Sequence, residues 1–267
     1  MKKWLTPALL GSAFIAIAIA ERRRPLRPRV EPGGRRVGRN FAMAGLTAII
    51  TAALQKPLVE PILRSTTQRR LGLLHRVSLP RPIRFLASIL LLDYTLWWWH
   101  WLNHVAQPLW RFHLVHHIDR DLDVFTAVRF HFGEMGLAAF FRAAQVRILG
   151  VDRDALEWWQ RMLLISILFH HSNLRLPRNV ERKLVLFIVT PRMHGIHHSE
   201  VEALTQSNWS SLFTCWDMLH RTFVYDVPQT TIGVPAWTDP EELTLEKLLA
   251  IPFRRQRDDW VRIPSGF

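Results

Sequence analysis

The sequence predicts an all-α integral-membrane protein, in which a helical bundle carries a histidine-rich helical cap on its cytoplasmic side. Apolar residues gather in runs that are long enough to cross a bilayer as helices. No segment alternates polar and apolar residues for long enough to indicate a β-sheet. Most of the histidines lie beyond the strongest apolar run, where they could form the cap.

The first apolar run, Trp4–Ala20, follows Lys2 and Lys3 and predicts an uncleaved anchor helix. A cleaved signal peptide is the alternative, since Ala18-Ile19-Ala20 resembles a cleavage site. The arginines that follow favour the anchor, because a positive block resists export. These arginines are Arg22, Arg23, Arg24, Arg27 and Arg29.

Two further runs predict membrane spans. Phe41–Leu54 continues past Pro57 and predicts either a kinked span or a shallow re-entrant segment. Phe85–Trp101 is the strongest candidate, and Trp97–Trp99 within it suits the aromatic belt at the headgroups. The residues that follow this run should therefore lie at the membrane surface.

Two weaker runs, Met135–Leu149 and Ala155–Phe169, contain charged residues. Each could be a tilted span, half of a hairpin or an interfacial amphipathic helix. Residues 172–267 are polar with short apolar patches and predict the cap. If the histidine end of Phe85–Trp101 is cytoplasmic, simple alternation of spans places the arginine-rich loop at residues 64–84 outside. This conflicts with the tendency of basic loops to stay in the cytoplasm, so the number of spans stays open. We divide the chain into membrane anchor helices and basic loops (1–82) and a histidine-bearing domain (83–267).

Composition excludes several classes of protein. The net charge of +13 comes mostly from arginine, which beside long apolar runs marks cytoplasmic loops or anionic headgroups more often than nucleic-acid sites. We therefore expect no nucleic-acid partner. The single cysteine, Cys215, excludes an internal disulfide, and its aromatic neighbours predict a buried thiol. No serine-hydrolase, nucleotide-binding or zincin motif is present, which leaves redox metal chemistry or metal handling.

Two copies of the pattern His-x-x-His-His predict a metal site. They occupy residues 113–117 and 194–198, and the pair His100 and His104 precedes the first. On a helix, residues three and four apart share a face, so each cluster presents its imidazoles in one direction. These eight imidazoles exceed the roughly four to six donors that one ion takes, so we expect two metal ions. Further candidate ligands are His131 and His170 or His171.

Carboxylates near these histidines could accept the second imidazole N–H and so orient a ligand. Asp93 and Glu134 are the strongest candidates, because each lies in an apolar or aromatic setting where a carboxylate needs a partner. The others are expected to be mainly solvated or helix-capping residues. They are Asp119, Asp121, Asp123, Glu200 and Glu202.

The order of these motifs resembles the fatty acid hydroxylase and sterol desaturase superfamily over roughly Phe85 to Phe253. The match extends to Ser207-Asn208, Trp216-Asp217 and Thr222-Phe223. One departure is Phe132, at a position where many relatives have proline. The segments that carry the resemblance are His100-Trp-Leu-Asn-His104, Trp110-Arg-Phe-His-Leu-Val-His-His117, Arg129-Phe-His131-Phe-Gly-Glu134, His171-Ser-Asn-Leu-Arg-Leu-Pro177 and His194-Gly-Ile-His-His198.

The resemblance implies an integral-membrane enzyme, located in the cell inner membrane with its site facing the cytoplasm. Two iron ions would use dioxygen and two electrons to hydroxylate or desaturate a C–H position of a lipid, whether fatty acyl, sterol or related isoprenoid. Zinc could substitute in a purified sample. A separate electron-donor protein is implied, since nothing in the chain resembles a haem or flavin module. Residues 83–267 would then be a fatty acid hydroxylase-like catalytic domain. The implied ligands are His100, His104, His113, His116, His117, His131, His171, His194, His197 and His198, while His170 is left out because relatives vary there.

The alternative is a membrane metal-binding or metal-transport protein without oxidative activity. A transporter should place ionisable residues near the middle of its spans. Here the histidines begin directly after Trp97–Trp99, at the end of a span, which favours the enzyme. A relative that keeps metal for structure only is less favoured, because its histidine clusters would not all be intact.

Overall fold

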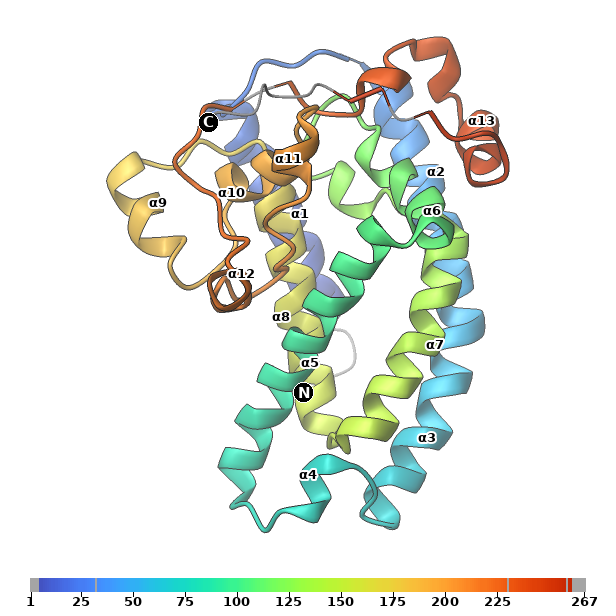
Figure 1. Ribbon diagram of the computed structural model, residues 1–267, viewed down its shortest axis with the longest axis vertical. Helices are drawn as coiled ribbons and strands as arrows, with labels where there is room; N and C mark the ends of the chain where they lie inside the picture. Colours follow the sequence, from blue (N-terminus) through green and yellow to red (C-terminus); the bar gives the residue numbers. More distant parts are fainter. Residues whose placement is uncertain (1–4, 32, 230, 258, 261–267) are drawn as a thin grey trace.

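A computed structural model of the chain describes residues 5–31, 33–229, 231–257 and 259–260. Long helices form an elongated bundle, and shorter helices and loops cover one end of it as a cap (Figure 1). Within the described residues no strand occurs, and isolated bridges such as Ile188 with Phe213 are the only β pairing. The predicted all-α, histidine-rich fold is therefore confirmed.

The elements divide between the bundle and the cap. The bundle contains α1 (Leu5–Arg23), α2 (Gly34–Ile50), η1 (Thr51–Gln55), α3 (Lys56–Gln68), α4 (Leu73–Arg76), α5 (Arg81–Val105), α7 (Phe132–Leu149) and α8 (Arg153–His171). The cap contains α6 (Gln107–His117), η2 (Thr126–Val128), α9 (Arg178–Leu184), α10 (Pro191–His197), α11 (Glu202–Thr205), α12 (Cys215–His220), η3 (Pro235–Trp237), η4 (Pro240–Leu243), α13 (Leu245–Ala250) and η5 (Ile251–Phe253).

Each apolar run of the sequence forms a bundle helix. The first forms α1, although Lys2, Lys3 and Trp4 lie outside the described residues. The weaker runs form α7 and α8, which run along the bundle beside α5 (Figure 1). The boundary predicted after residue 82 falls in the first turn of α5, so it marks the start of a helix and not a linker.

The second run forms one continuous helical path from the cap to the far end of the bundle (Figure 1), and it does not turn back as a re-entrant segment would. Its helical path passes through a π-helical segment, Thr51–Gln55, directly before Lys56 and Pro57. Proline lacks a backbone N–H, and its ring crowds the carbonyl one turn earlier. A wider turn at this position relieves that crowding, which explains the irregularity.

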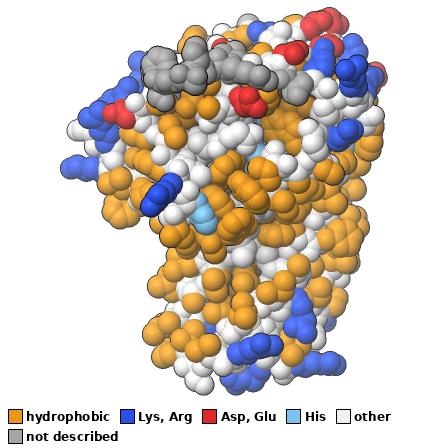
Figure 2. Space-filling model, viewed as in Figure 1, with side chains coloured by type: hydrophobic (Ala, Val, Ile, Leu, Met, Phe, Trp, Pro, Cys, Tyr) orange, Lys and Arg blue, Asp and Glu red, His pale blue; other side chains and the backbone are white. Residues whose placement is uncertain are grey.

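The bundle surface is apolar below the cap. Figure 2 shows hydrophobic side chains over most of this surface, with Lys and Arg gathered at its far end. Exposed examples are Ile49 on α2, Leu86 on α5 and Ile148 on α7. Within the described residues one helical stretch, Gly34–Arg76, has the length and composition of a membrane span. Together these features indicate association with a membrane.

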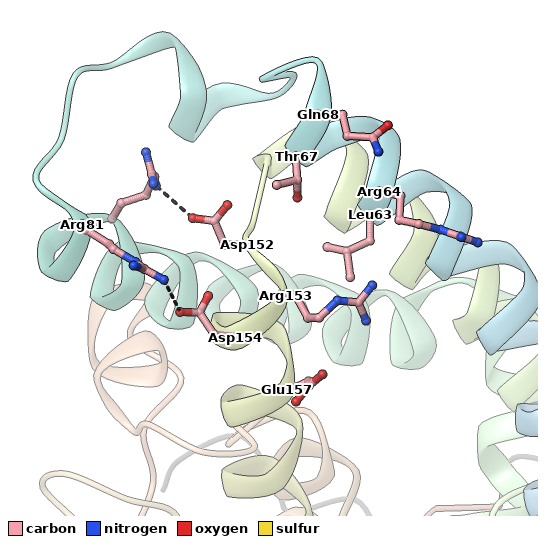
Figure 3. A pocket seen from close by; sticks show the side chains of 10 residues that line it. Leu63, Arg64, Thr67, Gln68, Arg81, Asp152, Arg153, Asp154 and Glu157 are labelled. Atoms are coloured by element: carbon pink, nitrogen blue, oxygen red, sulfur yellow. Dashed lines mark hydrogen bonds and ion pairs between the residues drawn. The ribbon is translucent and has the colours of Figure 1, made fainter. Parts of the chain in front are cut away.

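A charged cluster closes the far end of the bundle (Figure 3). Arg84 Nε lies 3.0 Å from Asp152 Oδ2, Arg81 lies 4.0 Å from Asp154, and Arg153 pairs with Glu60. From Arg153 to His171, α8 rises about 27 Å at 1.5 Å per residue. The charged cluster and the histidines are therefore separated by close to the thickness of a bilayer core, about 30 Å.

The turn between α7 and α8 is packed against the loop before α4. Gly150 ends α7 in the left-handed conformation, with a φ of 73°. A Cβ on Gly72 would lie 2.4 Å from the backbone nitrogen of Gly150. Glycine at both positions lets the two backbones touch, because no side chain intervenes.

Candidate metal centre

The fold brings nine histidines together where the bundle meets the cap, eight of them on four helices and His198 directly after α10. They form two groups, and within each group the candidate ligand atoms lie within 4.8 Å of one another. The first group is His100, His104, His113, His117 and His197, and the second is His116, His171, His194 and His198. These are nine of the ten histidines that the sequence predicts as ligands.

Helical spacing explains why one element serves both groups. His113 and His117 are four residues apart on α6 and face the first group, whereas His116 faces the second. The same division occurs near the end of α10, where His197 faces the first group and His194 and His198 the second. The His-x-x-His-His pattern thus distributes its imidazoles between two neighbouring positions.

Backbone carbonyls orient many of the rings through Nδ1. The Nδ1 atoms of His100, His116 and His197 lie 2.8, 3.0 and 2.7 Å from the carbonyl oxygens of Trp209, Arg129 and Ser207. His171 Nδ1 lies 2.9 Å from the carbonyl of Ile167. A carbonyl can only accept a hydrogen bond, so these Nδ1 atoms carry the proton and leave a lone pair on Nε2.

The second group shows most directly that a cation fits. His116 Nε2 and His171 Nε2 are 3.0 Å apart, although the carbonyl contacts assign a lone pair to both atoms. Two lone pairs cannot form a hydrogen bond and repel each other at this distance. Two nitrogens at right angles on one ion, each about 2.1 Å from it, would be about 3.0 Å apart. A metal ion shared by the two rings therefore satisfies the observed distance.

The first group fits a cation for a related reason. The Nε2 atoms of His104, His113, His117 and His197 are buried and have no hydrogen-bond partner among the described residues. Buried polar atoms without a partner destabilise a fold unless something else satisfies them. The candidate ligand atoms of these four rings lie within 4.8 Å of one another, and a metal ion between the rings would satisfy them.

Burial also keeps the imidazoles in the form that binds metal. It lowers the pKa of His117 and His198 well below the ordinary value, and it lowers the pKa of His197 to about 3. These rings are therefore neutral at pH 7, with a free lone pair for a cation.

Glu134 lies beside a candidate ligand, as the role expected from the sequence requires. Its Oε1 lies 2.9 Å from His113 Nδ1, and both side chains are buried. Replacing Glu134 with glutamine should lower metal affinity by about 10- to 100-fold without unfolding the protein, because an amide orients His113 more weakly. Competition with a chelator, followed by metal analysis, measures this. Glu157→Gln, which changes an exposed carboxylate on α8, should leave metal affinity unchanged.

The expectation for Asp93 is corrected. Its Oδ2 accepts hydrogen bonds from Trp216 Nε1 at 2.7 Å and from Phe213 N at 3.1 Å, and neither partner is a histidine. Asp93 therefore attaches α5 to the cap loop. Cys215, the first residue of α12, is exposed, contrary to the prediction of a buried thiol, because the neighbouring ring of Trp216 packs on Tyr94 of α5 without covering it.

His131 and His170 lie outside both groups. His131 accepts a hydrogen bond from Gly133 N at 2.9 Å and so caps α7, while its Nε2 faces the carbonyl of Leu249. Having both nitrogens turned away, His131 is not a ligand in our proposal. His170 lies beside His194, with ring centroids 4.2 Å apart, and its Nδ1 faces Ser166.

Asp217 supports the site in a way that its sequence position did not reveal. Its carboxylate accepts from Trp209 N and Ser210 N, both at 3.0 Å, and from Trp97 Nε1 at 2.9 Å. It thereby holds the loop whose Trp209 carbonyl orients His100. The Trp216-Asp217 motif was a usable signal for this residue, although not for its role.

A buried network of ion pairs between α2 and the residues that follow α6 also supports the site. Arg36 on α2 donates two hydrogen bonds to Asp119, each 2.8 Å long, and one of 2.7 Å to Asp123. Arg129 lies 3.4 Å from Asp119, and its own carbonyl orients His116. Asp121 accepts from two backbone N–H groups, those of residues 30 and 31. These aspartates are therefore buried, and the expectation that they are solvated was wrong. Asp123 does act as a cap, because its Oδ1 accepts from Phe125 N at 3.0 Å and from Thr126 N at 3.3 Å at the start of η2.

A cavity of about 170 Å³ opens beneath the histidines between α5, α7 and α8. Its upper part is lined by His100, His113, His116 and His171, and its lower part by apolar residues that include Leu96, Phe141 and Leu163. A molecule in this cavity would lie directly against both histidine groups.

Comparisons with known proteins agree with this geometry. The family model for fatty acid hydroxylase matches residues 85–222. The ornithine lipid hydroxylase OlsE of Rhizobium tropici is 28% identical over 158 residues, 58% of this chain and 46% of that protein. Alkylglycerol monooxygenases of Homo sapiens and Xenopus tropicalis are 22% and 24% identical over 153 residues, 57% of this chain and 33% of each of them.

The chain spans a third to a half of the length of these relatives. No solved structure gives a significant match. The family match nevertheless covers more than half of the sequence and includes both histidine groups. The chain therefore belongs to the fatty acid hydroxylase family.

Proposed function

We propose that this protein is a membrane-bound di-iron oxygenase that uses dioxygen and two electrons to hydroxylate a C–H position of a lipid. The observation that carries the proposal is the pair of facing lone pairs on His116 and His171, 3.0 Å apart, which calls for a cation. The nine grouped histidines would hold two ions, the first on five imidazoles and the second on four. The relatives are lipid hydroxylases and monooxygenases by name, which supports the same class of reaction.

Iron would supply what side chains lack, namely an oxidant strong enough to break an unactivated C–H bond. The protein's own residues would do the rest. The carbonyls of Trp209, Arg129 and Ser207 fix ring orientation, and Glu134 does the same for His113. The apolar walls formed by Leu96, Phe141 and Leu163 would exclude water and hold a hydrocarbon segment against the ions.

We infer that the bundle spans the cell inner membrane and that the cap faces the cytoplasm. The exposed apolar surface of the bundle and the bilayer-like separation of its charged end from the histidines support the first part. The exposed arginines Arg22, Arg29 and Arg35 lie where α1 and α2 meet the cap, which supports the second part. A separate cytoplasmic protein would then deliver the electrons.

Metal analysis combined with lipid mass spectrometry tests the function. The purified protein should contain about two iron ions per chain, allowing for zinc that replaces iron on purification. Membranes that contain the protein, iron and a reductant should gain a lipid with one extra oxygen, in an oxygen-dependent manner. Ornithine lipid and alkylglycerols are the first substrates to supply, since the relatives are named for them.

Other outcomes would overturn the proposal. A product that lacks two hydrogens and gains no oxygen would identify a desaturase. Metal flux into vesicles without any oxidised lipid would identify a metal-transport protein. His171→Ala is the matched control, because it removes one of the facing nitrogens and should abolish product formation.

A further inference from the structure

A positively charged side chain lies in the lower part of the cavity beneath the histidines. Arg142 on α7 lines this part together with Leu96, Phe141 and Leu163. Its guanidinium donates a hydrogen bond to the side-chain oxygen of Gln145, and its Cζ lies 4.2 Å from the centre of the Trp159 ring. Among the described residues, no carboxylate forms an ion pair with Arg142.

An arginine in this position needs an explanation. A charged side chain within a membrane-spanning helix is costly, and such residues normally pair with an opposite charge. The indole of Trp159 and the amide of Gln145 compensate only in part, since neither carries a negative charge. Gln145 is itself committed to α5, because it donates to the Leu92 carbonyl at 3.2 Å and to Thr95. By contrast, Arg147 on the same helix is exposed at the surface.

We propose that Arg142 binds the anionic group, a carboxylate or a phosphate, of the lipid substrate, an inference that rests on the proposed function. A guanidinium suits either group because its planar fork donates two parallel hydrogen bonds. Arg142 lies two turns of α7 below Glu134, a rise of about 12 Å. An anionic group held by Arg142 would therefore direct a carbon several bonds away toward the histidines.

A groove beside the cavity offers a place for the rest of the lipid. It measures about 710 Å³ and lies between α2, η1 and α3 on one side and α8 on the other. Phe130, Met135 and Ile167 line both the groove and the cavity, so the two are neighbours. Phe130 also stacks on His116, with ring centroids 4.5 Å apart. A hydrocarbon chain in the groove could thus remain joined to a headgroup in the cavity.

Binding of matched lipids to the full chain in detergent tests this inference. The probes are hexadecanoate, hexadecyl phosphate and methyl hexadecanoate, which share a chain and differ in charge. The unmodified protein should bind one or both anions at least tenfold more tightly than the ester, as measured by displacement of a radiolabelled lipid. A preference for only one anion would identify the acidic group. Equal affinity for all three probes would overturn the inference, and this comparison requires no variant to fold.

Variants locate the preference. Arg142→Gln should lose at least tenfold in affinity for the preferred anion and leave the affinity for the ester unchanged. Arg142→Lys, which keeps the charge, should retain part of the preference, and Arg147→Gln should retain all of it. If Arg142→Gln lowers the melting temperature of the lipid-free protein and keeps the preference for anions, Arg142 has a structural role and the inference is wrong.

The binding assay involves no oxidation, so the two proposals fail separately. An anion preference that depends on Arg142 in a protein that oxidises no lipid would refute only the proposed function. Oxidation of a lipid by a protein that binds acid and ester equally would refute only this inference.

Discussion

Replacing His197 with alanine should reduce the metal content from about two ions to about one per chain, and lipid oxidation should fall at least about a hundredfold. The Nε2 of His197 is buried without a hydrogen-bond partner in the first group, so alanine removes a donor that nothing nearby can replace. The second group does not include His197 and should keep its ion. Metal analysis and an oxygen-dependent lipid assay on the same sample measure both effects.

His131→Ala is the matched control for this experiment. His131 is fully buried, like His197, but lies outside both groups and caps α7. The variant should lose some stability and retain both ions. If His197→Ala keeps the full metal content, the first group is not a metal site. If it unfolds instead, the metal serves the fold and not the reaction.

Replacing Asp119 with alanine should destabilise the protein by about 3–5 kcal/mol, because it leaves buried arginine without its partner. Asp119 is 1% exposed and Arg36 3%. Arg129, which also contacts Asp119, is fully buried. Thermal unfolding in detergent measures the loss. Metal affinity should fall as well, since the Arg129 carbonyl orients His116.

Asp226→Ala is the control for Asp119. Asp226 pairs with Arg178 in an exposed ion pair, so its removal should change stability little. Acid should also remove the stability that Asp119 contributes, because a protonated carboxyl no longer pairs with the buried arginines. Burial alone would raise the pKa of Asp119, but Arg36 and Arg129 together hold it well below the ordinary 3.8. The stability that Asp119 contributes is therefore fully present above pH 3.8 and is lost as the pH falls through the folded-state pKa. An equal loss of stability in Asp119→Ala and Asp226→Ala would contradict the buried network.

The sequence was sufficient for features that depend on local spacing. Helices α1, α5, α7 and α8 arise from apolar runs whose length alone predicts them. The division of His113, His116 and His117 between two positions follows from the helical period, and the order of the clusters indicated the family. These properties require no knowledge of distant parts of the chain.

Features that depend on distant partners could not be predicted in this way. Asp93 lies in an apolar run, and the sequence does not show that its partner is Trp216, 123 residues away. The carboxylates of Asp119 and Asp123 resemble solvated loop residues until Arg36 is placed beside them. His131 matches the family motif, yet the start of α7 turns its Nδ1 toward the backbone of Gly133. In each case the tertiary contact determined the role.

The pairing of Arg36 with Asp119 and Asp123 also limits when α2 can reach its final position during synthesis of the chain. Arg36 is synthesised more than eighty residues before either aspartate, so the guanidinium has no partner among them until both have been made. Final docking of α2 therefore has to follow translation of residue 123, when α5 is already complete. Shortening the nascent protein before that point should leave α2 undocked, however apolar it is.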